Sequence, residues 1–201
     1  MKQIPKRVRL TLIPIVLGLF VALFIHHFIA QPVKVTDNDM APNLRTGQTV
    51  WLSATRKPHR FDVVLVVQQG VTPTTPQSHY TMLRVIGMPG DTVAYKAGLL
   101  YLNGHKTTQS FLSHTQQSNG TSQFDWDLVS LSQSEGWIQP NTSYKVPANH
   151  YFLMGDNRQS ANDSRHIGFI PRNAIRGVVR LAPWQAGSNA ITILITHRSR
   201  L

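Results

Sequence analysis

The chain has 201 residues, which is enough for one medium-sized domain or for one domain with an appendage. It contains no cysteine, so disulfides, free thiols and cysteine zinc sites are all excluded. The formal net charge of +11 is compatible with nucleic-acid binding, but the basic residues are scattered and form no aromatic-interleaved stripe. We therefore expect no nucleic-acid partner, and interpret the charge as attraction to anionic lipid or cell-wall polymers, or as plain solubility.

An apolar run from Leu10 to Ala30 dominates the start of the chain. As a helix with a rise of about 1.5 Å per residue it can cross a hydrocarbon core of about 30 Å, so residues 10–30 are predicted to be a transmembrane anchor. A cleaved secretory signal fits less well, because its apolar region is shorter and a small-x-small cleavage site follows it. Membrane lipid is therefore an expected partner.

Basic residues precede this run, and no acidic residue stands among them. An excess of Lys and Arg on the short flank predicts that residues 1–9 are cytoplasmic. Residues 31–201 then form an extracytoplasmic domain of a single-pass cell-membrane protein. The basic residues of the flank are Lys2, Lys6, Arg7 and Arg9.

Beyond the anchor the pattern is typical of β-structure, because short runs rich in β-branched residues alternate with turn signals. Asn103–Gly104 favours a tight hairpin, and Met88–Asp91 suits a type II turn with Gly90 at positive φ. The fold class is therefore mostly β, as an antiparallel sheet or barrel. The expected strands are Val33–Thr36, Thr49–Leu52, Asp62–Val67, Tyr80–Ile86, Thr92–Tyr95, Leu99–Leu102, Tyr151–Met154, Gly177–Leu181 and Ala190–Thr196.

Two polar stretches interrupt this pattern. The first, Val71–His79, is rich in Thr and Pro and is predicted to be an exposed loop. The second, residues 105–144, contains aromatic residues at Phe111, Phe124, Trp126 and Trp137, which are enough for a small core. It is predicted to be an inserted β subdomain or a flap.

Three segments in fixed order carry a family resemblance: V-T-D-N-D-M-A-P-N-L (Val35–Leu44), R-V-I-G-M-P-G-D (Arg84–Asp91) and G-D-N-R-Q-S-A-N-D-S-R (Gly155–Arg165). Together with H-R-F-D-V-V-L-V (His59–Val66), they resemble the type I signal peptidase family. The resemblance implies a membrane-anchored antiparallel β fold whose site lies near the membrane surface and receives exported precursors. It also implies a Ser/Lys catalytic dyad.

Such a dyad needs a Ser hydroxyl, a neutral Lys that takes its proton, and a second hydroxyl that orients the amine. The Lys is neutral only where apolar surroundings lower its pKa from about 10.4. Carried over by position, the nucleophile corresponds to Asp39, the Lys to Leu83 and the orienting hydroxyl to Ala161. All three parts of the proton relay are replaced.

The replacements are chemically coordinated. Leu83 keeps apolar bulk without an amine, and Ala161 is a serine without its oxygen. Asp39 places an anion where an oxyanion requires hydrogen-bond donors. Loss of nucleophile and base costs on the order of 10⁶ in turnover, so we expect the Ser/Lys reaction to be absent.

Two other chemistries remain to be weighed. Paired carboxylates can activate water, and Asp39 could pair with Asp37, Asp156 or Asp163. Strand geometry would place Asp37 and Asp39 on one face about 6–7 Å apart, which is far for a shared proton. No ligand spacing supports a metal site, and no cofactor is implied.

The family resemblance also implies that an extended precursor segment pairs with Pro32–Asp39 and Tyr80–Arg84 by β-addition. The predicted substrate-binding residues are Val35, Thr36, Asp37, Met40, Tyr80 and Met82. Signature residues with an expected structural role, in turns and ion pairs, are Arg84, Gly87, Pro89, Gly90, Asp91, Gly155, Asp156, Asn157, Arg158, Asp163 and Arg165. Gly155 is expected to permit a turn, and Arg158 and Arg165 are expected to pair with Asp156 or Asp163.

The leading hypothesis is therefore a membrane-anchored signal peptidase homologue without peptidase activity, which binds precursor segments or assists an active paralogue. Two alternatives stay open. One is an endopeptidase that uses carboxylate chemistry, and the other is a structural or partner-binding module.

Overall fold

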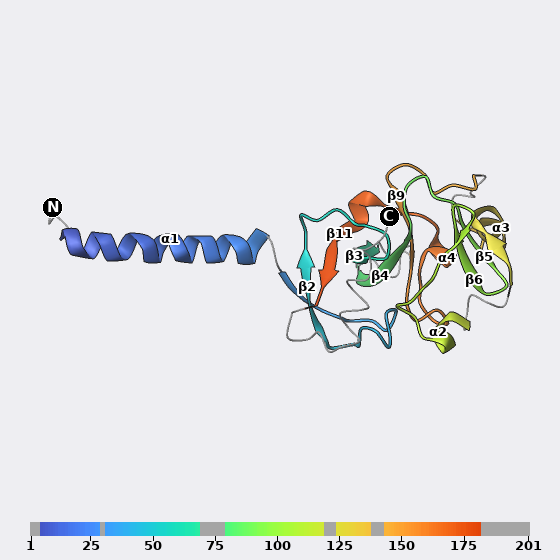
Figure 1. Cartoon of the computed structure of the whole chain (residues 1–201), viewed down its shortest axis with the longest axis horizontal. Coiled ribbons are helices and arrows are strands. Elements are labelled where there is room, and N and C mark those ends of the chain that lie inside the picture. Colours follow the sequence, from blue (N-terminus) through green and yellow to red (C-terminus); the bar gives the residue numbers. More distant parts are fainter. Residues whose placement is uncertain (1–4, 29–30, 69–78, 119–123, 138–142, 182–201) are drawn as a thin grey trace.

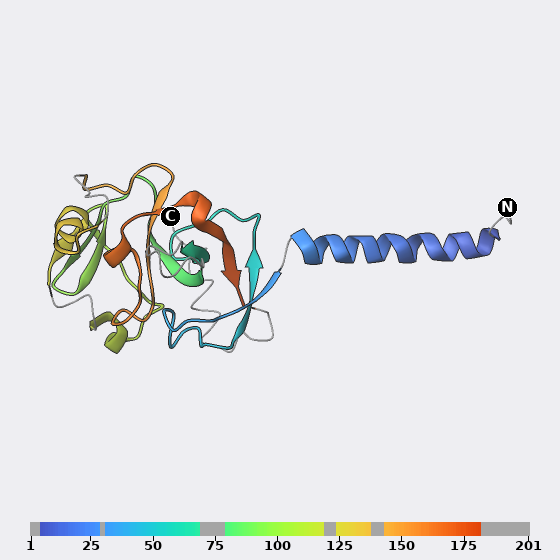
Figure 2. The same ribbon diagram turned by 180° about the vertical axis from the view of Figure 1, so that it is seen from behind.

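The computed structural model describes residues 5–28, 31–68, 79–118, 124–137 and 143–181. Helix α1 (Lys6–Phe28) projects from a β body (Figure 1), and the same arrangement is seen from behind in Figure 2. Among the described residues, no helix combines the length and the apolarity of a membrane span. The anchor over residues 10–30 remains a prediction.

The main sheet has seven strands in the order β1-β2-β11-β3-β4-β9-β10, and every pairing in it is antiparallel. The prediction of a mostly β, antiparallel fold is therefore confirmed. The strands are β1 (Gln31–Lys34), β2 (Thr49–Ser53), β3 (Val63–Gln68), β4 (His79–Gly87), β9 (His150–Met154), β10 (Ile170–Pro171) and β11 (Ile175–Arg180).

A second antiparallel sheet has the order β7-β6-β5-β8. Asn103 and Gly104 turn the chain from β6 to β7 with φ of +52° and +79°, the left-handed values of a tight hairpin. The predicted hairpin is therefore present. The strands are β5 (Val93–Lys96), β6 (Leu99–Leu102), β7 (His105–Lys106) and β8 (Trp126–Asp127).

The central strands β3 and β4 are buried on both faces, which explains the nearly continuous apolar run V-V-L-V-V of β3. Successive side chains point to opposite faces. Leu65 and Met82 accordingly join one apolar cluster, while Val64 and Leu83 join another on the opposite face. This alternation decides which side chains of β4 reach which side of the site.

The described residues of the polar stretch between β7 and β9 contribute to a third apolar cluster, which they share with residues of both sheets. Phe111 and Trp137 pack in that cluster with Ile86 of β4 and Phe152 of β9, whereas Phe124 is exposed. Asp127 and Ser130 form a capping box at the start of α3. The short helices are α2 (His114–Ser118), α3 (Leu128–Ser134), α4 (Ser164–Ile167) and the 3-10 turn η1 (Arg172–Ala174).

Most predicted strands are present, with bounds that shift by a few residues. The shift of the first strand changes where the candidate site residues lie. The strand expected over Val33–Thr36 ends at Lys34, so Asp37 and Asp39 lie in a turn. The reason is local, because the backbone of Val35 bonds to residues 47 and 48 of the following turn. The strand expected over Ala190–Thr196 and most of the loop over Val71–His79 lie outside the described residues.

A fully buried ion pair joins β4 to the segment that follows β9. The Arg84 guanidinium donates to both carboxylate oxygens of Asp156, with Nε to Oδ1 at 2.7 Å, and to the carbonyl of Phe61 at 2.9 Å. Asn43 donates to the same carboxylate at 2.7 Å. The guanidinium also lies over the Phe111 ring, 4.2 Å from its centroid.

We expect Arg84→Met to lower the free energy of unfolding by about 3–5 kcal/mol, because it leaves the Asp156 carboxylate buried without its charge partner. Urea unfolding of the full chain measures this change. The double variant Arg84→Met, Asp156→Leu is the control and should recover much of the loss, since no charge remains buried. A single-variant cost below about 1 kcal/mol would contradict this account.

Candidate functional site

Asp39 lies in the turn after β1, where it contacts both β4 and the segment after β9. Its carboxylate accepts a hydrogen bond from the Thr81 hydroxyl at 2.9 Å. Its backbone carbonyl accepts one from the N–H of Asn157 at 2.9 Å, and the Asn157 side chain donates to the carbonyl of Asn38. The position of the nucleophile is thus held from two sides.

Gly155 lets these segments approach closely. A Cβ at this residue would lie 2.3 Å from the Ala161 Cβ and 2.5 Å from the Asp39 carbonyl oxygen, so no side chain fits. We expected Gly155 to permit a turn. Its φ is not among the positive values of the described residues, and what requires glycine is the close contact. The structure therefore brings together Asp39 and Ala161, the positions that the family resemblance assigns to the nucleophile and the orienting hydroxyl.

Leu83 shares a face of β4 with Thr81, two residues before it, so position 83 lies next to the hydroxyl that holds Asp39. Its side chain is 0% exposed and packs in the cluster that contains Val64, Val85 and Leu153. These surroundings are apolar enough to depress the pKa of an amine, but position 83 carries none. In the described part of the chain, no Lys, Arg or His side chain bonds to Thr81 or to the Asp39 carboxylate.

Burial raises the pKa of the Asp39 carboxyl above its ordinary 3.8, and the nearby charges of Asp37 and Asp163 raise it further. The hydrogen bonds from Thr81 and from the backbone of Asn162 oppose this shift. A carboxylate is too weak a base to take the proton of an alcohol hydroxyl. The hydrogen bond from Thr81 to Asp39 therefore does not turn the Thr81 hydroxyl into an activated nucleophile.

Asp37 bonds to the backbone of Asp39. Its Oδ1 accepts the backbone N–H of Asp39 at 3.2 Å. The expectation that Asp37 and Asp39 share a strand face is wrong, because the strand ends before them. In the turn they are joined by this side chain-to-backbone bond, which is not a proton shared between carboxylates.

The other candidate carboxylates are held by cations. Asp156 pairs with Arg84, as described above, and Asp163 pairs with Arg165 at 2.8 Å while accepting the N–H of Gly155. We expected Arg158 to pair with one of these acids. Its buried guanidinium instead bonds to Tyr95, Gln109 and the carbonyl of Gly155. Among the described residues, no group of three or more His, Asp or Glu side chains could hold a metal ion.

The turn that follows β4 keeps the geometry predicted for it. Gly90 has a φ of +89°, and the N–H of Asp91 bonds back to the carbonyl of Met88. The Asp91 carboxylate accepts the N–H of Met88 and pairs with Arg60 at 2.9 Å. Gly87 is required for packing, because a Cβ there would lie 2.8 Å from a methyl group of Val93. The predicted structural role of this segment is consistent with these contacts.

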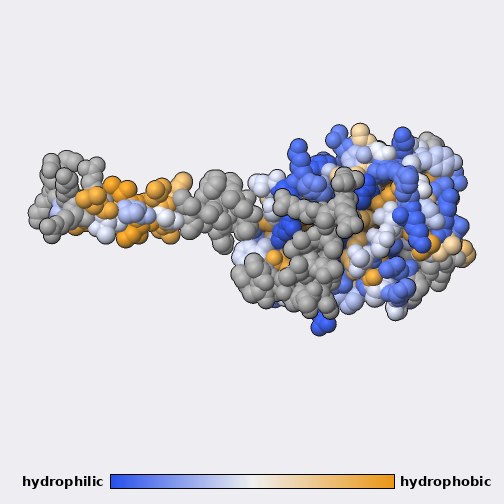
Figure 3. All heavy atoms as spheres, viewed as in Figure 1, coloured by the Kyte–Doolittle hydropathy of each residue, from blue (hydrophilic) through white to orange (hydrophobic). Residues whose placement is uncertain are grey.

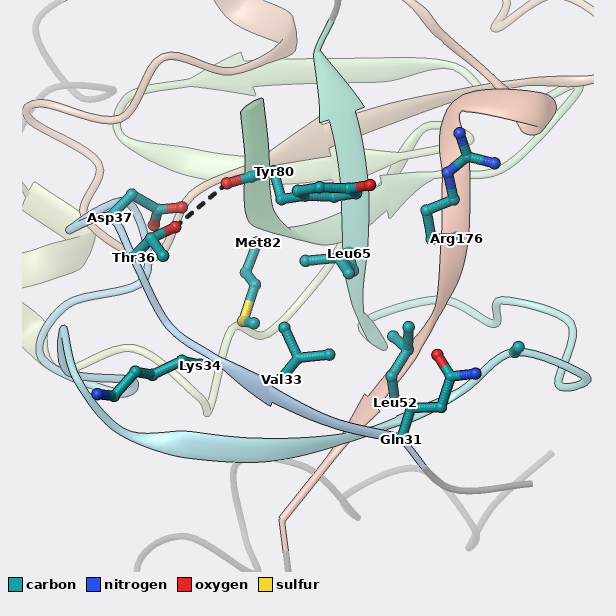
Figure 4. Close-up of a pocket in the computed structure, with 11 residues that line it drawn as sticks. Gln31, Val33, Lys34, Thr36, Asp37, Leu52, Leu65, Tyr80, Met82 and Arg176 are labelled. Atoms are coloured by element: carbon teal, nitrogen blue, oxygen red, sulfur yellow. Dashed lines mark hydrogen bonds between the residues drawn. The ribbon is translucent and has the colours of Figure 1, made fainter. Parts of the chain in front are cut away.

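A groove of about 800 Å³ opens between β1, β4 and β11 (Figure 4). Val33, Leu52, Leu65 and Met82 give it apolar walls. Asp37 stands with Thr36 and Tyr80 at one end, and Arg176 stands at the other. Its lining residues are Gln31, Val33, Lys34, Thr36, Asp37, Leu52, Ala54, Leu65, Tyr80, Met82 and Arg176.

Four of the six predicted substrate-binding residues line this groove: Thr36, Asp37, Tyr80 and Met82. The other two, Val35 and Met40, are buried in the apolar cluster that also contains Leu65 and Met82.

Sequence reasoning missed several of the lining residues. Leu65 lies opposite Met82 in the pairing of β3 with β4. A predicted pairing of these two strands could therefore have identified Leu65 as a neighbour of Met82 in the groove. Arg176 has no such signal, because an irregularity between Ile175 and Gly177 breaks the alternation of β11 there.

One edge of β4 next to the groove has no strand beside it. Tyr80–Leu83 pair with β3 on one side, whereas pairing with β9 begins only at Arg84. Within the described residues, no strand covers the second edge of this half of β4, and the Tyr80 carbonyl accepts only a long bond of 3.4 Å from the Thr36 hydroxyl. An extended peptide could therefore add along this edge.

The fold and the site together define an antiparallel β protein with an apolar-walled groove of about 800 Å³ against β4. The family model described as "Signal peptidase, peptidase S26" matches residues 8–184. The chain belongs to this signal peptidase family.

The first two relatives described here, both from Bacillus subtilis, agree with this assignment. The chain is 33% identical to signal peptidase I T of Bacillus subtilis (strain 168) over 168 residues, which cover 81% of this chain and 78% of that protein. It is 34% identical to signal peptidase I S of the same organism, with 81% and 82% covered. A crystal structure of a signal peptidase I from Enterococcus faecalis V583 matches 61% of this chain and 97% of that chain, at 31% identity and a TM-score of 0.47.

We expect Asp39→Asn to stabilise the folded chain at neutral pH by on the order of 1 kcal/mol or less, because the half-buried carboxylate is partly screened by solvent. A raised folded-state pKa means that the folded chain holds this proton more tightly than the unfolded chain. Ionisation of Asp39 therefore destabilises the folded chain fully at pH values above its folded-state pKa. It does not destabilise the folded chain at pH values below its unfolded-state pKa. Urea unfolding from pH 8 down to pH 4 should show the advantage of the variant shrinking towards pH 4.

The control is Asp125→Asn, which removes a carboxylate that accepts the N–H of Ala97, remote in sequence from the site. Comparison of the two variants separates the removal of the Asp39 carboxylate from the removal of a carboxylate elsewhere in the chain. A constant difference between Asp39→Asn and the parent across the whole range would mean that ionisation of Asp39 is not the cause.

Proposed function

We propose that this chain is a membrane-anchored member of the signal peptidase family that has lost the Ser/Lys peptidase reaction and binds extended segments of exported precursors at the remaining cleft. The observation that carries the proposal is the replacement of the amine by Leu83 in a fully buried apolar position. A hydroxyl nucleophile needs a base, and aliphatic carbon cannot accept a proton.

The other two positions support the same conclusion. Asp39 places a carboxylate where the attacking hydroxyl would stand, and Asp37 accepts the backbone N–H of that same residue. Both effects oppose an oxyanion, which needs donors and is repelled by anions. The bonds of Asp37 and Asp39 to other donors also argue against the alternative aspartyl mechanism.

Peptide binding is supported by features that do not depend on the lost groups. The uncovered edge of β4 offers backbone hydrogen bonds, and the neighbouring groove offers an apolar wall for alternate side chains. β-addition takes its affinity from the main chain, so replacing the catalytic side chains leaves it in place. An active paralogue that shares the same precursors is a further expected partner.

The membrane location is part of the proposal. Figure 3 shows apolar side chains along the projecting helix α1 and a largely hydrophilic face on the β body. The large side chains of α1 that are exposed include Leu10, Ile13 and Phe20. An exposed apolar surface of this kind needs a covering partner, and lipid fits the apolar run over residues 10–30.

The wild-type chain should not cleave a signal-bearing precursor, whereas the triple variant Asp39→Ser, Leu83→Lys, Ala161→Ser should cleave it. We expect the triple variant to cleave at least about 100-fold faster than the parent. This recovers only part of the loss on the order of 10⁶ that follows removal of nucleophile and base. Adding Asp37→Ala should raise the rate again, because it frees the Asp39 backbone N–H from an anion. Gel analysis of precursor incubated with the full chain in detergent gives the rates.

The matched control carries Met in place of Lys at position 83, which has similar length and no amine, and it should be inactive. Cleavage by the wild-type chain that survives Asp39→Ala would refute the claim that this site is silent. A folded but inactive triple variant would show that the frame no longer supports the dyad.

A further inference from the structure

The groove beside β4 is lined by charges of both signs that differ in burial. Arg176 lies at the end opposite Asp37, whereas Lys34 lies on the same side as Asp37 (Figure 4). Lys34 and Arg176 are exposed, and Asp37 is half-buried. Asp39, also half-buried, is joined to Asp37 by the 3.2 Å bond between its N–H and the Asp37 carboxylate. In the described residues, neither acid forms an ion pair with a Lys, Arg or His side chain.

Burial decides which of these charges dominates recognition. Exposed charges are screened by water and contribute little to a pair. Charged hydrogen bonds at partly desolvated sites contribute more. The two half-buried acids should therefore discriminate between ligands more strongly than the exposed Lys34 and Arg176 do.

The position of the acids relative to the uncovered edge of β4 fixes where a ligand charge would meet them. Thr81, in the middle of that edge, bonds to Asp39, and Thr36, next to Asp37, bonds to the Tyr80 carbonyl. A segment lying along residues 80–83 would place one side chain against Met82 and Leu65 in the groove. A neighbouring side chain would then meet the two carboxylates.

Resting on the proposed function, we propose that the site selects extended segments in which a Lys or Arg closely follows the apolar side chain that fills the groove. The cation pairs with Asp37 and Asp39, so the position of the lost nucleophile becomes a specificity determinant for a basic residue. Precursor segments with an acidic residue at that point are rejected by like charge.

Three fluorescein-labelled peptides test this, with the same Leu-Val-Ala core followed by Lys, Gln or Glu. Fluorescence anisotropy with the full chain in detergent gives their affinities at low and moderate salt. We expect the Lys peptide to bind about 10-fold more tightly than the Gln peptide and the Glu peptide to bind most weakly, with the preference falling as salt rises.

The variant Asp37→Asn, Asp39→Asn keeps the shape of the site and should bind the Lys and Gln peptides within about twofold of each other. Arg176→Gln is the matched control at the other end of the groove, and it should keep the preference for Lys. Equal binding of Lys and Gln peptides by the wild-type chain would overturn the selectivity while leaving peptide binding intact. Absence of binding by all three would overturn the proposed function as well.

Two further results would overturn the proposal, because each would show a different occupant of the groove. Displacement of the Lys peptide by phosphatidylcholine micelles would assign the two acids to a choline headgroup. A dimer seen by light scattering that dissociates when the Lys peptide is added would assign the groove to a second copy of this chain.

Discussion

The buried pair between Arg84 and Asp156 holds the two halves of the site together. Arg84 directly follows position 83 on β4, and Asp156 directly follows Gly155, so one ion pair fixes position 83 relative to the segment that carries position 161. Asn43 brings the turn that contains Asp39 to the same carboxylate. Positions 39, 83 and 161 therefore all lie within a few residues of one buried charge network, whose disruption is costly.

This arrangement explains how the fold accommodates aliphatic side chains at positions 83 and 161. The buried frame consists of Arg84, Asp156, Asp163 and Arg165, which bond to one another, to backbone groups and to the Asn43 side chain. The reactive side chains would project from this frame without bracing it. Leu83 and Ala161 suit their buried positions better than polar groups without partners would, because a buried unpaired polar group costs free energy.

The sequence was a good guide to the strands and a weaker one to the site. The run V-V-L-V-V and the turn at Gly90 predicted β3 and the end of β4, because burial and positive φ leave clear local patterns. The turn at Asp37 and Asp39 was mistaken for strand, since its cause is a backbone bond to residue 47 with no side-chain signal. Arg158 was assigned an acid, but its partners Tyr95 and Gln109 come from the polar stretch and its sheet.

Contacts such as those of Arg158 join residues far apart in the sequence, and they cannot be predicted from the spacing of residues along the chain. The same limit applies to Gly155, whose neighbours Asp39 and Ala161 are defined only when three segments meet. The family motifs predicted that Asp39, Gly155 and Ala161 belong to one site. The structure supplies the reason for the glycine at position 155. Where a motif residue serves packing, its role is visible only in the distance to a residue elsewhere in the chain.

Asp39 differs in kind from Leu83 and Ala161, the two other positions to which the proposed function assigns a lost catalytic group. Leu83 and Ala161 are apolar, whereas Asp39 is a half-buried anion near Asp37 and Asp163, and burial raises its pKa. An alanine at position 39 would carry no such cost. A half-buried carboxylate joined to Asp37, which lines the groove, is best understood through what it binds, because a ligand cation offsets both its desolvation and its repulsion by neighbouring acids. The physical chemistry of this residue thus favours recognition of a basic side chain over mere decay of an enzyme.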